Sequence, residues 1–438
     1  MTMTRNSTTY KSRIQEVTLA NGFKVYLMPI PGCKTISLRL CLTSDFVSLN
    51  DDPMVETTAT MTGEMLLKGS GNFSHETLSQ DLDDMCLSGI RFSGDSVSLK
   101  LGATIVANDL PKLLEIIYDA LANPSFDENQ LAILKNQYTG YVLSQKSDTG
   151  ALAGIALMQK LYPKSSRYYV SDPDYDVNCL NQLNESHMRQ YLKRMVNGKQ
   201  RHIVMVGDFD DKEVTSVLND SVGKLPVTDC ARTCYEQTSD KDMFTADSGG
   251  FTVKTQVPGK SSTDIKIAFP LDFDRKDKDF EACLVASNIL GGDTLTSRLG
   301  KEVREKQGLT YGITASFKDT KFLYSPLTIE ITVNPKNVDK ALKSIDEVMN
   351  DFLANGVTQS ELNAEVMSLI NGISISRRTN MAVCQAISRC LEQGLDLAEL
   401  DSSKDVLAKL TVSDVNEAIR RHFKPAYDKF KVISIAGS

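Results

Sequence analysis

The chain of 438 residues is too long for one ordinary hydrophobic core and predicts two to four domains. Its hydrophobic fraction of 41% and charged fraction of 24% are those of a globular protein, which excludes disordered, collagen-like and coiled-coil classes. With 49 basic and 56 acidic residues the net charge is −7, so a nucleic-acid partner is not expected. Four histidines must carry any histidine-based metal chemistry: His75, His187, His202 and His422.

The cysteine pattern and the hydropathy of the chain indicate where the protein works. Nine cysteines, an odd number, are scattered without a framework, which suits a reducing compartment. No stretch approaches the roughly 18 to 20 apolar residues of a membrane span. Residues 1–13 lack the apolar run of a signal peptide. We therefore expect no membrane span and a cytoplasmic location.

The first half of the sequence carries the signals of a sheet with helices. Asn21-Gly22 separates two strand-like runs and predicts a hairpin of antiparallel strands. Alternating apolar residues predict further strands at 36–40 and 97–105. Ser74 is a good N-cap and predicts that a helix begins at the next residue. Antiparallel strands with helices between them favour an α+β fold.

The same elements recur in the second half of the sequence. Each segment reappears 227–232 residues further on, in the same order. The strand-then-helix unit 97–117 recurs at 325–345, the strand 36–40 at 265–269, and the helix-then-strand unit 183–209 at 410–438. Such ordered self-similarity predicts a tandem duplication.

A polar segment without any sustained period, residues 227–249, separates the two copies and predicts a linker. The predicted domains are therefore 1–226 and 250–438. We expect each to be an α+β repeat, with helices packed on one face of a mostly antiparallel sheet.

The most specific local string is SRLGKEVREKQGLTYGI, residues 297–313. It follows a helix-like run that Gly291-Gly292 is expected to end with left-handed backbone. Arg304 and Tyr311 lie on either side of a predicted turn at Gly308. Arg304 offers a planar set of donors and Tyr311 a hydroxyl, which together suit the binding of a peptide carbonyl. Composition alone favours a plainer reading, a surface Arg and a half-buried Tyr at a helix end.

The longer string GGDTLTSRLGKEVREKQGLTYGI resembles the second-domain signature of the pitrilysin/insulinase-type peptidases, which include mitochondrial processing peptidase. The resemblance covers essentially the whole chain and implies paired α+β repeats that form half of a clamshell. It also implies that Arg304 and Tyr311 bind the backbone of a substrate at a zinc site carried by another domain. Only Gly291 and Gly292 stand where the mitochondrial regulatory subunit has a long glycine-rich loop, which favours a bacterial-type heterodimer.

The zinc half of the family pattern is degenerate. In the family, an inverted His-x-x-Glu-His motif on a helix holds zinc and activates its water. The matching segment here, residues 57–70, has Thr60, Gly63 and Glu64 at the three motif positions. A further glutamate ligand is implied within residues 129–147, which contain no Asp or Glu. We expect no metal on this chain.

These observations lead to two functional hypotheses. The resemblance implies a non-catalytic, substrate-binding subunit of a heterodimeric zinc metalloendopeptidase, inactive alone. Its homologous partner would carry the zinc, and its substrate would be an extended peptide. The alternative is a proteolytically inactive structural or peptide-binding homologue.

Overall fold

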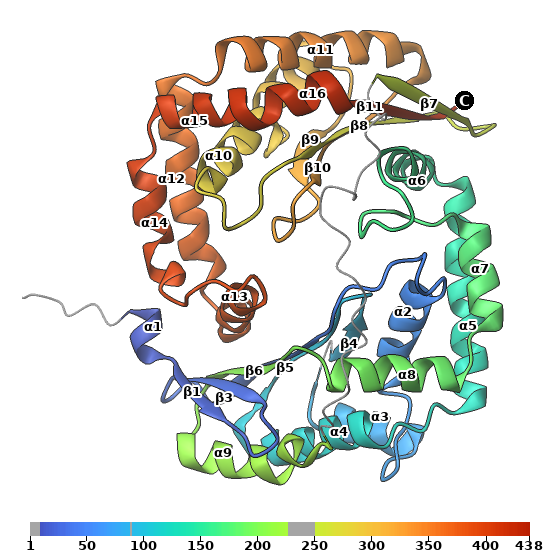
Figure 1. Ribbon diagram of the computed structural model, residues 1–438, viewed down its shortest axis with the longest axis vertical. Coiled ribbons are helices and arrows are strands. Elements are labelled where there is room, and N and C mark those ends of the chain that lie inside the picture. Colours follow the sequence, from blue (N-terminus) through green and yellow to red (C-terminus); the bar gives the residue numbers. More distant parts are fainter. Residues whose placement is uncertain (1–8, 88–89, 227–249) are drawn as a thin grey trace, which may run out of the picture. The chain divides into compact units, whose positions relative to one another are not determined.

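The computed structural model describes residues 9–87, 90–226 and 250–438 (Figure 1). The chain divides into two compact units, each described here by itself. Unit 1 contains the described residues within Met1–Tyr138, Asn178–Gln237 and Ser374–Ser403, and unit 2 those within Thr139–Val177, Thr238–Ile373 and Lys404–Ser438. Each unit thus draws on both halves of the sequence. The predicted domains 1–226 and 250–438 stay a prediction, and the predicted linker 227–249 lies outside the described residues.

Unit 1 is built on a sheet with strand order β1-β2-β6-β3-β5-β4. Its strands are β1 (Gln15–Thr18), β2 (Lys24–Pro29), β3 (Thr35–Thr43), β4 (Arg91–Gly94), β5 (Ser98–Val106) and β6 (Gln200–Gly207). Only β2 and β6 pair in parallel within this described sheet. The predicted hairpin is confirmed, since β1 and β2 are antiparallel and Gly22 between them has a φ of 82°.

The helices that contribute to unit 1 are mostly those of the first half of the sequence. They are α1 (Tyr10–Arg13), α2 (Val55–Met65), α3 (His75–Asp84), η1 (Ala107–Asp109), α4 (Leu110–Ala122), α5 (Glu128–Ser144), α7 (Pro173–Gln182), α8 (Glu185–Val196), α9 (Asp211–Asp220), η3 (Val222–Lys224), α13 (Asn380–Glu392) and α14 (Glu399–Lys409). Among the described residues, the chain passes between the units within α5, α7, α12 (Gln359–Ser376) and α14. The predicted cap at Ser74 is confirmed, because its side chain accepts a hydrogen bond from the backbone N of Thr77.

Unit 2 repeats the sheet of unit 1 without the first strand. Its strands are β7 (Phe251–Gln256), β8 (Thr263–Leu271), β9 (Ile313–Phe317), β10 (Ser325–Val333) and β11 (Val432–Gly437). The order β7-β11-β8-β10-β9 matches β2-β6-β3-β5-β4, and the single parallel pair, β7 with β11, falls at the matching place. The predicted α+β class, the duplication and the mostly antiparallel sheets are therefore confirmed.

Helices of unit 2 pack on both faces of its sheet. They include η2 (Gln145–Ser147), α6 (Thr149–Leu161), α10 (Phe280–Gly291), η5 (Gly300–Lys306), η6 (Pro335–Asn337), α11 (Val338–Asn355), α12 (Gln359–Ser376), α15 (Val412–Ala418), η7 (Ile419–Phe423) and α16 (Lys424–Phe430). α10 and α11 lie on the main core and α6 on the opposite face. Strand residues such as Ile267 and Ile329 form one core with Val285 of α10 and Phe352 of α11. No described helix is long and apolar enough to cross a membrane.

Two helices pack on the sheet of the opposite half of the sequence. α6, from the first half, packs on β8 and β11 in unit 2, where Leu157 and Leu161 join one cluster with Val432. α13, from the second half, packs on β3 and β6 in unit 1, where Ile387 joins a cluster with Val204 (Figure 1). Sequence periodicity gives no signal of this exchange. Each sheet is therefore completed by a helix that the other repeat encodes.

Candidate functional site

The degenerate zinc motif lies on α2, which packs directly against β4 in unit 1. A Cβ on Gly63 would lie 3.0 Å from the backbone N of Gly94 and 3.1 Å from the carbonyl O of Phe92. In return, a Cβ on Gly94 would lie 2.3 Å from the carbonyl O of Ala59. Glycine at both positions therefore lets the helix and the strand touch through their backbones.

The other two motif positions carry a hydroxyl and a carboxylate in place of the two histidines. Thr60 is a partly buried residue without a ligand neighbour among the described clusters. Glu64 pairs with Arg91 of β4, with 3.0 Å between Oε1 and Nε. Thr60, Gly63 and Glu64 thus do not fit a zinc ion, because Thr60 and Gly63 offer no ligand of the motif, Glu64 is paired with Arg91, and a side chain at Gly63 would be tight against β4.

The Arg/Tyr signature lies in unit 2, between α10 and β9. Arg304 is half-buried on η5, a π-helical segment. Gly308 has a φ of 62°, so the predicted turn between Arg304 and Tyr311 is confirmed. Tyr311 is 97% exposed, while Leu309 and Ile313 beside it are buried. An aromatic ring so exposed contributes little to the fold, so its position invites a functional explanation.

A hydrogen-bonded frame holds the loop before this signature. The Asp293 carboxylate accepts hydrogen bonds from the backbone N of Thr296 and of Leu295. These bonds hold the pKa of Asp293 below its usual range, and the bond from Thr296 has the larger effect. Thr294 Oγ1 accepts from the backbone N of Ile313 at 3.0 Å, which ties the loop to β9. Tyr311 therefore lies two residues before the start of β9, which this hydrogen bond ties to the loop.

The expected role of Gly291-Gly292 is wrong. Gly292 ends α10 with right-handed backbone, at a φ of −67°, so neither residue supplies a left-handed turn. The reason for glycine is close packing instead. A Cβ on Gly291 would lie 2.5 Å from the Cβ of Ala315, on β9. These residues therefore bring α10 against the strand that follows Tyr311.

Arg298, in the same string, is a structural residue that sequence reasoning missed. Its guanidinium donates to both carboxylate oxygens of Glu361 on α12, at 2.7 and 2.8 Å, and to the carbonyl O of Gly356. The bonds from Arg298 are the main reason that the pKa of Glu361 falls to about 2. No local pattern marks this pair, because its members are 63 residues apart. Of the two arginines in the string, Arg298 therefore joins the signature to α12 and has a structural role. Arg304 is the one that can bind a ligand.

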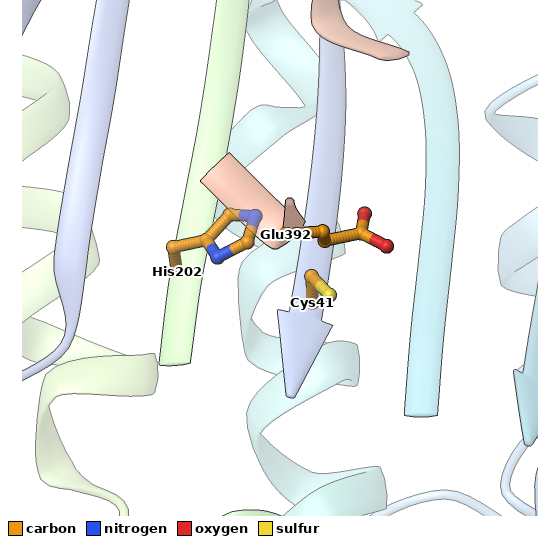
Figure 2. Close-up of side chains that lie close together, drawn as sticks. All are labelled: Cys41, His202 and Glu392. Atoms are coloured by element: carbon orange, nitrogen blue, oxygen red, sulfur yellow. The ribbon is translucent and has the colours of Figure 1, made fainter. Parts of the chain in front are cut away.

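A second cluster of possible metal ligands lies under α13 in unit 1. Cys41 of β3, His202 of β6 and Glu392 of α13 place one ligand atom each within 4.8 Å of one another (Figure 2). The sequence gave no signal for it, because the three residues come from three distant segments. Cys41 and His202 are buried.

The charges around this cluster argue against a cation. Glu392 already pairs with Lys100 at 2.6 Å and lies 4.0 Å from the guanidinium of Arg39. Burial lowers the pKa of Lys100, but Glu392 outweighs it, so the net shift is upward and Lys100 stays charged. Burial lowers the pKa of His202 to about 4, and its Nε2 lies 3.0 Å from Ser388 Oγ. A divalent ion would have to enter beside two cations, so we assign these residues to an internal ion-pair network.

The other acidic cluster, Asp277, Asp279 and His422 in unit 2, is similarly occupied. His422 lies 2.8 Å from Asp272 through Nδ1 and 3.2 Å from Asp279 through Nε2. Arg421 pairs with Asp279 as well. This cluster is therefore an ion-pair network that joins η7 to the start of α10.

Comparison with known proteins agrees with the fold. Residues 182–369 match the family model described as the peptidase M16 inactive domain. A curated relative, the "Non-peptidase homolog YmxG" of Helicobacter pylori, is 22% identical over 321 residues, which are 72% of this chain and 70% of that protein. Over residues 182–369 the chain is thus similar to the inactive domain of the peptidase M16 family. The zinc residues of the family motif are absent from this chain at Thr60, Gly63 and Glu64.

Solved structures of M16 proteins share the fold of this chain. A peptidase M16 inactive domain from Pseudomonas fluorescens superposes with a TM-score of 0.83 at 23% identity and covers 97% of both chains. A protease from Helicobacter pylori gives a TM-score of 0.82 at 16% identity, with 97% of this chain and 99% of that chain covered. The fold shared with these two structures therefore extends over 97% of this chain.

Proposed function

We propose that this chain is the non-catalytic subunit of a heterodimeric zinc metalloendopeptidase, and that it contributes Arg304 and Tyr311 to an active site whose zinc is carried by a homologous partner. The observation that carries the proposal is the contrast between two sites of one chain. The zinc-motif positions lack their ligands, and a side chain at Gly63 would be tight against β4, while Tyr311 is 97% exposed just before β9.

Both side chains have chemistry that suits an extended peptide. The Arg304 guanidinium can donate to a peptide carbonyl, and the Tyr311 hydroxyl can donate to the same oxygen as negative charge develops on it. Removing one such donor from an active site typically lowers kcat by about 10²- to 10³-fold. The hydrolytic step itself belongs to the partner, since no described residue of this chain replaces the missing ligands at Thr60, Gly63 and Glu64.

The experiment mixes this chain with a homologous chain that carries an intact His-x-x-Glu-His motif and follows cleavage of quenched fluorescent peptides. We expect activity only from the mixture. Arg304→Ala and Tyr311→Phe should lower the activity of the complex without changing its zinc content. Arg420→Ala, an exposed arginine of η7, is the matched control and should leave activity unchanged. Zinc and activity in the lone chain, or normal turnover with Arg304→Ala, would refute the proposal.

The second candidate is a peptide-binding protein without proteolysis, which the name of the Helicobacter pylori relative favours. The same mixture separates the two functions. A binding protein would retain peptide binding that depends on Tyr311, yet no homologous zinc-bearing chain would cleave the bound peptide in its presence.

A further inference from the structure

A cavity of about 880 Å³ lies in unit 2, on the polar face of the sheet and beside α6. Its size is in the range of ligand pockets. One wall is the end of α5, η2 and one side of α6, and the floor is the outer face of β8, β9 and β10. The lining residues used below are Asp148, Lys260, Lys266, Ser316, Lys318 and Glu330.

The alternation of residues along the strands makes this face polar. On β8 and β10 the apolar residues Ile265, Ile267 and Ile329 point to the core, so Lys266 and Glu330 point to the other face. α6 covers that face over β8 and β11. A Cβ on Gly154 would lie 3.6 Å from Lys266 Nζ, so the helix runs close to this lysine. The cavity is the part of the polar face that α6 leaves open.

The equivalent helix of unit 1 shows what is missing. There α13 brings Glu392 onto Lys100, and the Glu392 side chain is only 13% exposed. α6 contains no acidic residue in Thr149–Leu161. Lys266 pairs instead with Glu330 of the neighbouring strand at 2.9 Å, and that glutamate is 49% exposed. The cavity in unit 2 therefore lacks the buried carboxylate that closes the matching face in unit 1.

The lining has an excess of positive charge. Three lysines line the cavity against two acids, Asp148 and Glu330, which gives +1 where the whole chain carries −7. Asp148 accepts a hydrogen bond from the backbone N of Ala151 and caps α6. The carboxylate of Glu330 forms an ion pair with Lys266. The ammonium of Lys260 forms no ion pair with the described residues.

We propose that this cavity binds a carboxylate-bearing segment of an extended peptide, with Lys260 and Lys266 as the cations that receive its acidic side chain. The segment would take the place that Glu392 holds in unit 1. Lys266 would exchange its half-exposed partner Glu330 for the carboxylate of the peptide. This inference rests on the peptide binding of the proposed function, and it adds that the preferred peptides are acidic.

The first test uses the purified full chain and two fluorescent decapeptides with blocked ends. One peptide alternates alanine and glutamate, and the other has glutamine in place of glutamate. We expect the acidic peptide to bind at least about 10-fold more tightly at low salt, with the difference shrinking as salt is added. Lys260→Glu should abolish the preference. Lys278→Glu makes the same change of charge at an exposed lysine outside the cavity and should preserve it.

The second test fills the cavity. Ser316 and Thr314 are both exposed positions of β9, but only Ser316 lines the cavity. Ser316→Trp should therefore weaken binding of the acidic peptide about 10-fold or more, whereas Thr314→Trp should not. The chain contains no Trp, so each variant carries a single fluorophore, and the acidic peptide should change the emission only of the Trp at 316.

Equal affinity for the two peptides, or acidic-peptide binding that survives both Lys260→Glu and Ser316→Trp, would overturn the inference. The outcome is separable from that of the proposed function. These measurements need no partner chain, and the cleavage assay with Arg304→Ala needs no acidic peptide. If the acidic peptide is not preferred but Arg304→Ala still lowers cleavage by the complex, only the peptide site in the cavity is refuted, and the proposed function stands.

Discussion

Gly63 of α2 and Gly94 of β4 approach so closely that a Cβ on the first would lie 3.0 Å from the backbone N of the second. The contact occupies the position at which a catalytic member of the family carries its glutamate. This chain has therefore lost the zinc ligands of the motif, and the helix packs tightly on the strand at the glutamate position. Glu64, at the position of the second histidine, pairs with Arg91 instead.

Substitution of either glycine should be destabilising. Gly94→Ala is expected to lower the free energy of unfolding by about 1–3 kcal/mol, because its Cβ would lie 2.3 Å from the carbonyl O of Ala59. Gly140→Ala is the control. Gly140 is an exposed residue of α5 with nothing within 4 Å of a new Cβ, so alanine there should stabilise by up to about 1 kcal/mol. Urea unfolding measures both, and losses of similar size would contradict the packing argument.

Restoration of the ligands should fail to restore a metal site. The triple variant Thr60→His, Gly63→Glu and Glu64→His places the motif on α2, but the glutamate would be tight against β4, and residues 129–147 supply no further carboxylate ligand. We expect a destabilised protein that binds no stoichiometric zinc in atomic absorption measurements. One zinc ion per chain, with the thermal stability of the parent, would show that α2 can move away from the strand.

The Arg298–Glu361 pair predicts that the folded protein loses stability at acid pH. The pKa of Glu361 is about 2 in the folded protein, below the usual value of 4.5, so the pair stabilises the fold above pH 4.5 and the contribution is lost as the pH falls toward 2. Glu361→Gln should therefore flatten the fall of Tm in this range. Glu347→Gln, an exposed glutamate of α11, is the control and should leave the slope unchanged.

The partly buried Lys100–Glu392 pair should fasten α13 to the sheet of unit 1. Glu392→Gln leaves Lys100 without its carboxylate and is expected to cost about 3–5 kcal/mol of unfolding free energy. The double variant Lys100→Met and Glu392→Met should be less damaging than either single change, because no uncompensated charge remains. A double-mutant cycle in urea tests this, and additive losses would show that the two residues act independently.

His422 predicts an opposite pH dependence. Burial lowers its pKa, but hydrogen bonds to Asp272 and Asp279 outweigh burial and raise it above 6.5. The charged imidazole therefore stabilises the fold below pH 6.5, and this contribution is lost as the pH rises through the folded pKa. Its other charged neighbours are Asp277 and Arg421. The Tm difference between the parent and His422→Asn should be larger at pH 5.5 than at pH 8.5, and a constant difference would contradict the assignment.

Local and repeated patterns made much of the fold predictable. The hairpin at Asn21-Gly22, the cap at Ser74 and the turn at Gly308 follow from single residues whose backbone or capping preferences are strong. The duplication was readable because both copies kept the same alternation of apolar residues. The strand order of each sheet then follows that duplication.

Features that depend on distant partners could not be predicted. Arg298 and Glu361 meet across 63 residues, and Gly291 is needed only because β9 passes over it. The tight packing at Gly63 likewise depends on Gly94, which lies 31 residues beyond Gly63 and belongs to another element. The Arg304 and Tyr311 pair was visible in the sequence, while the exposure of Tyr311 needed the structure.

The exchange of α6 and α13 makes the two repeats mutually dependent. A fragment that ends at residue 226 would lack α13 and leave the Lys100 side of its sheet bare, and a fragment that starts at residue 250 would lack α6. Each repeat therefore needs a helix encoded by the other copy to cover one face of its sheet, and we expect the two repeats to fold together.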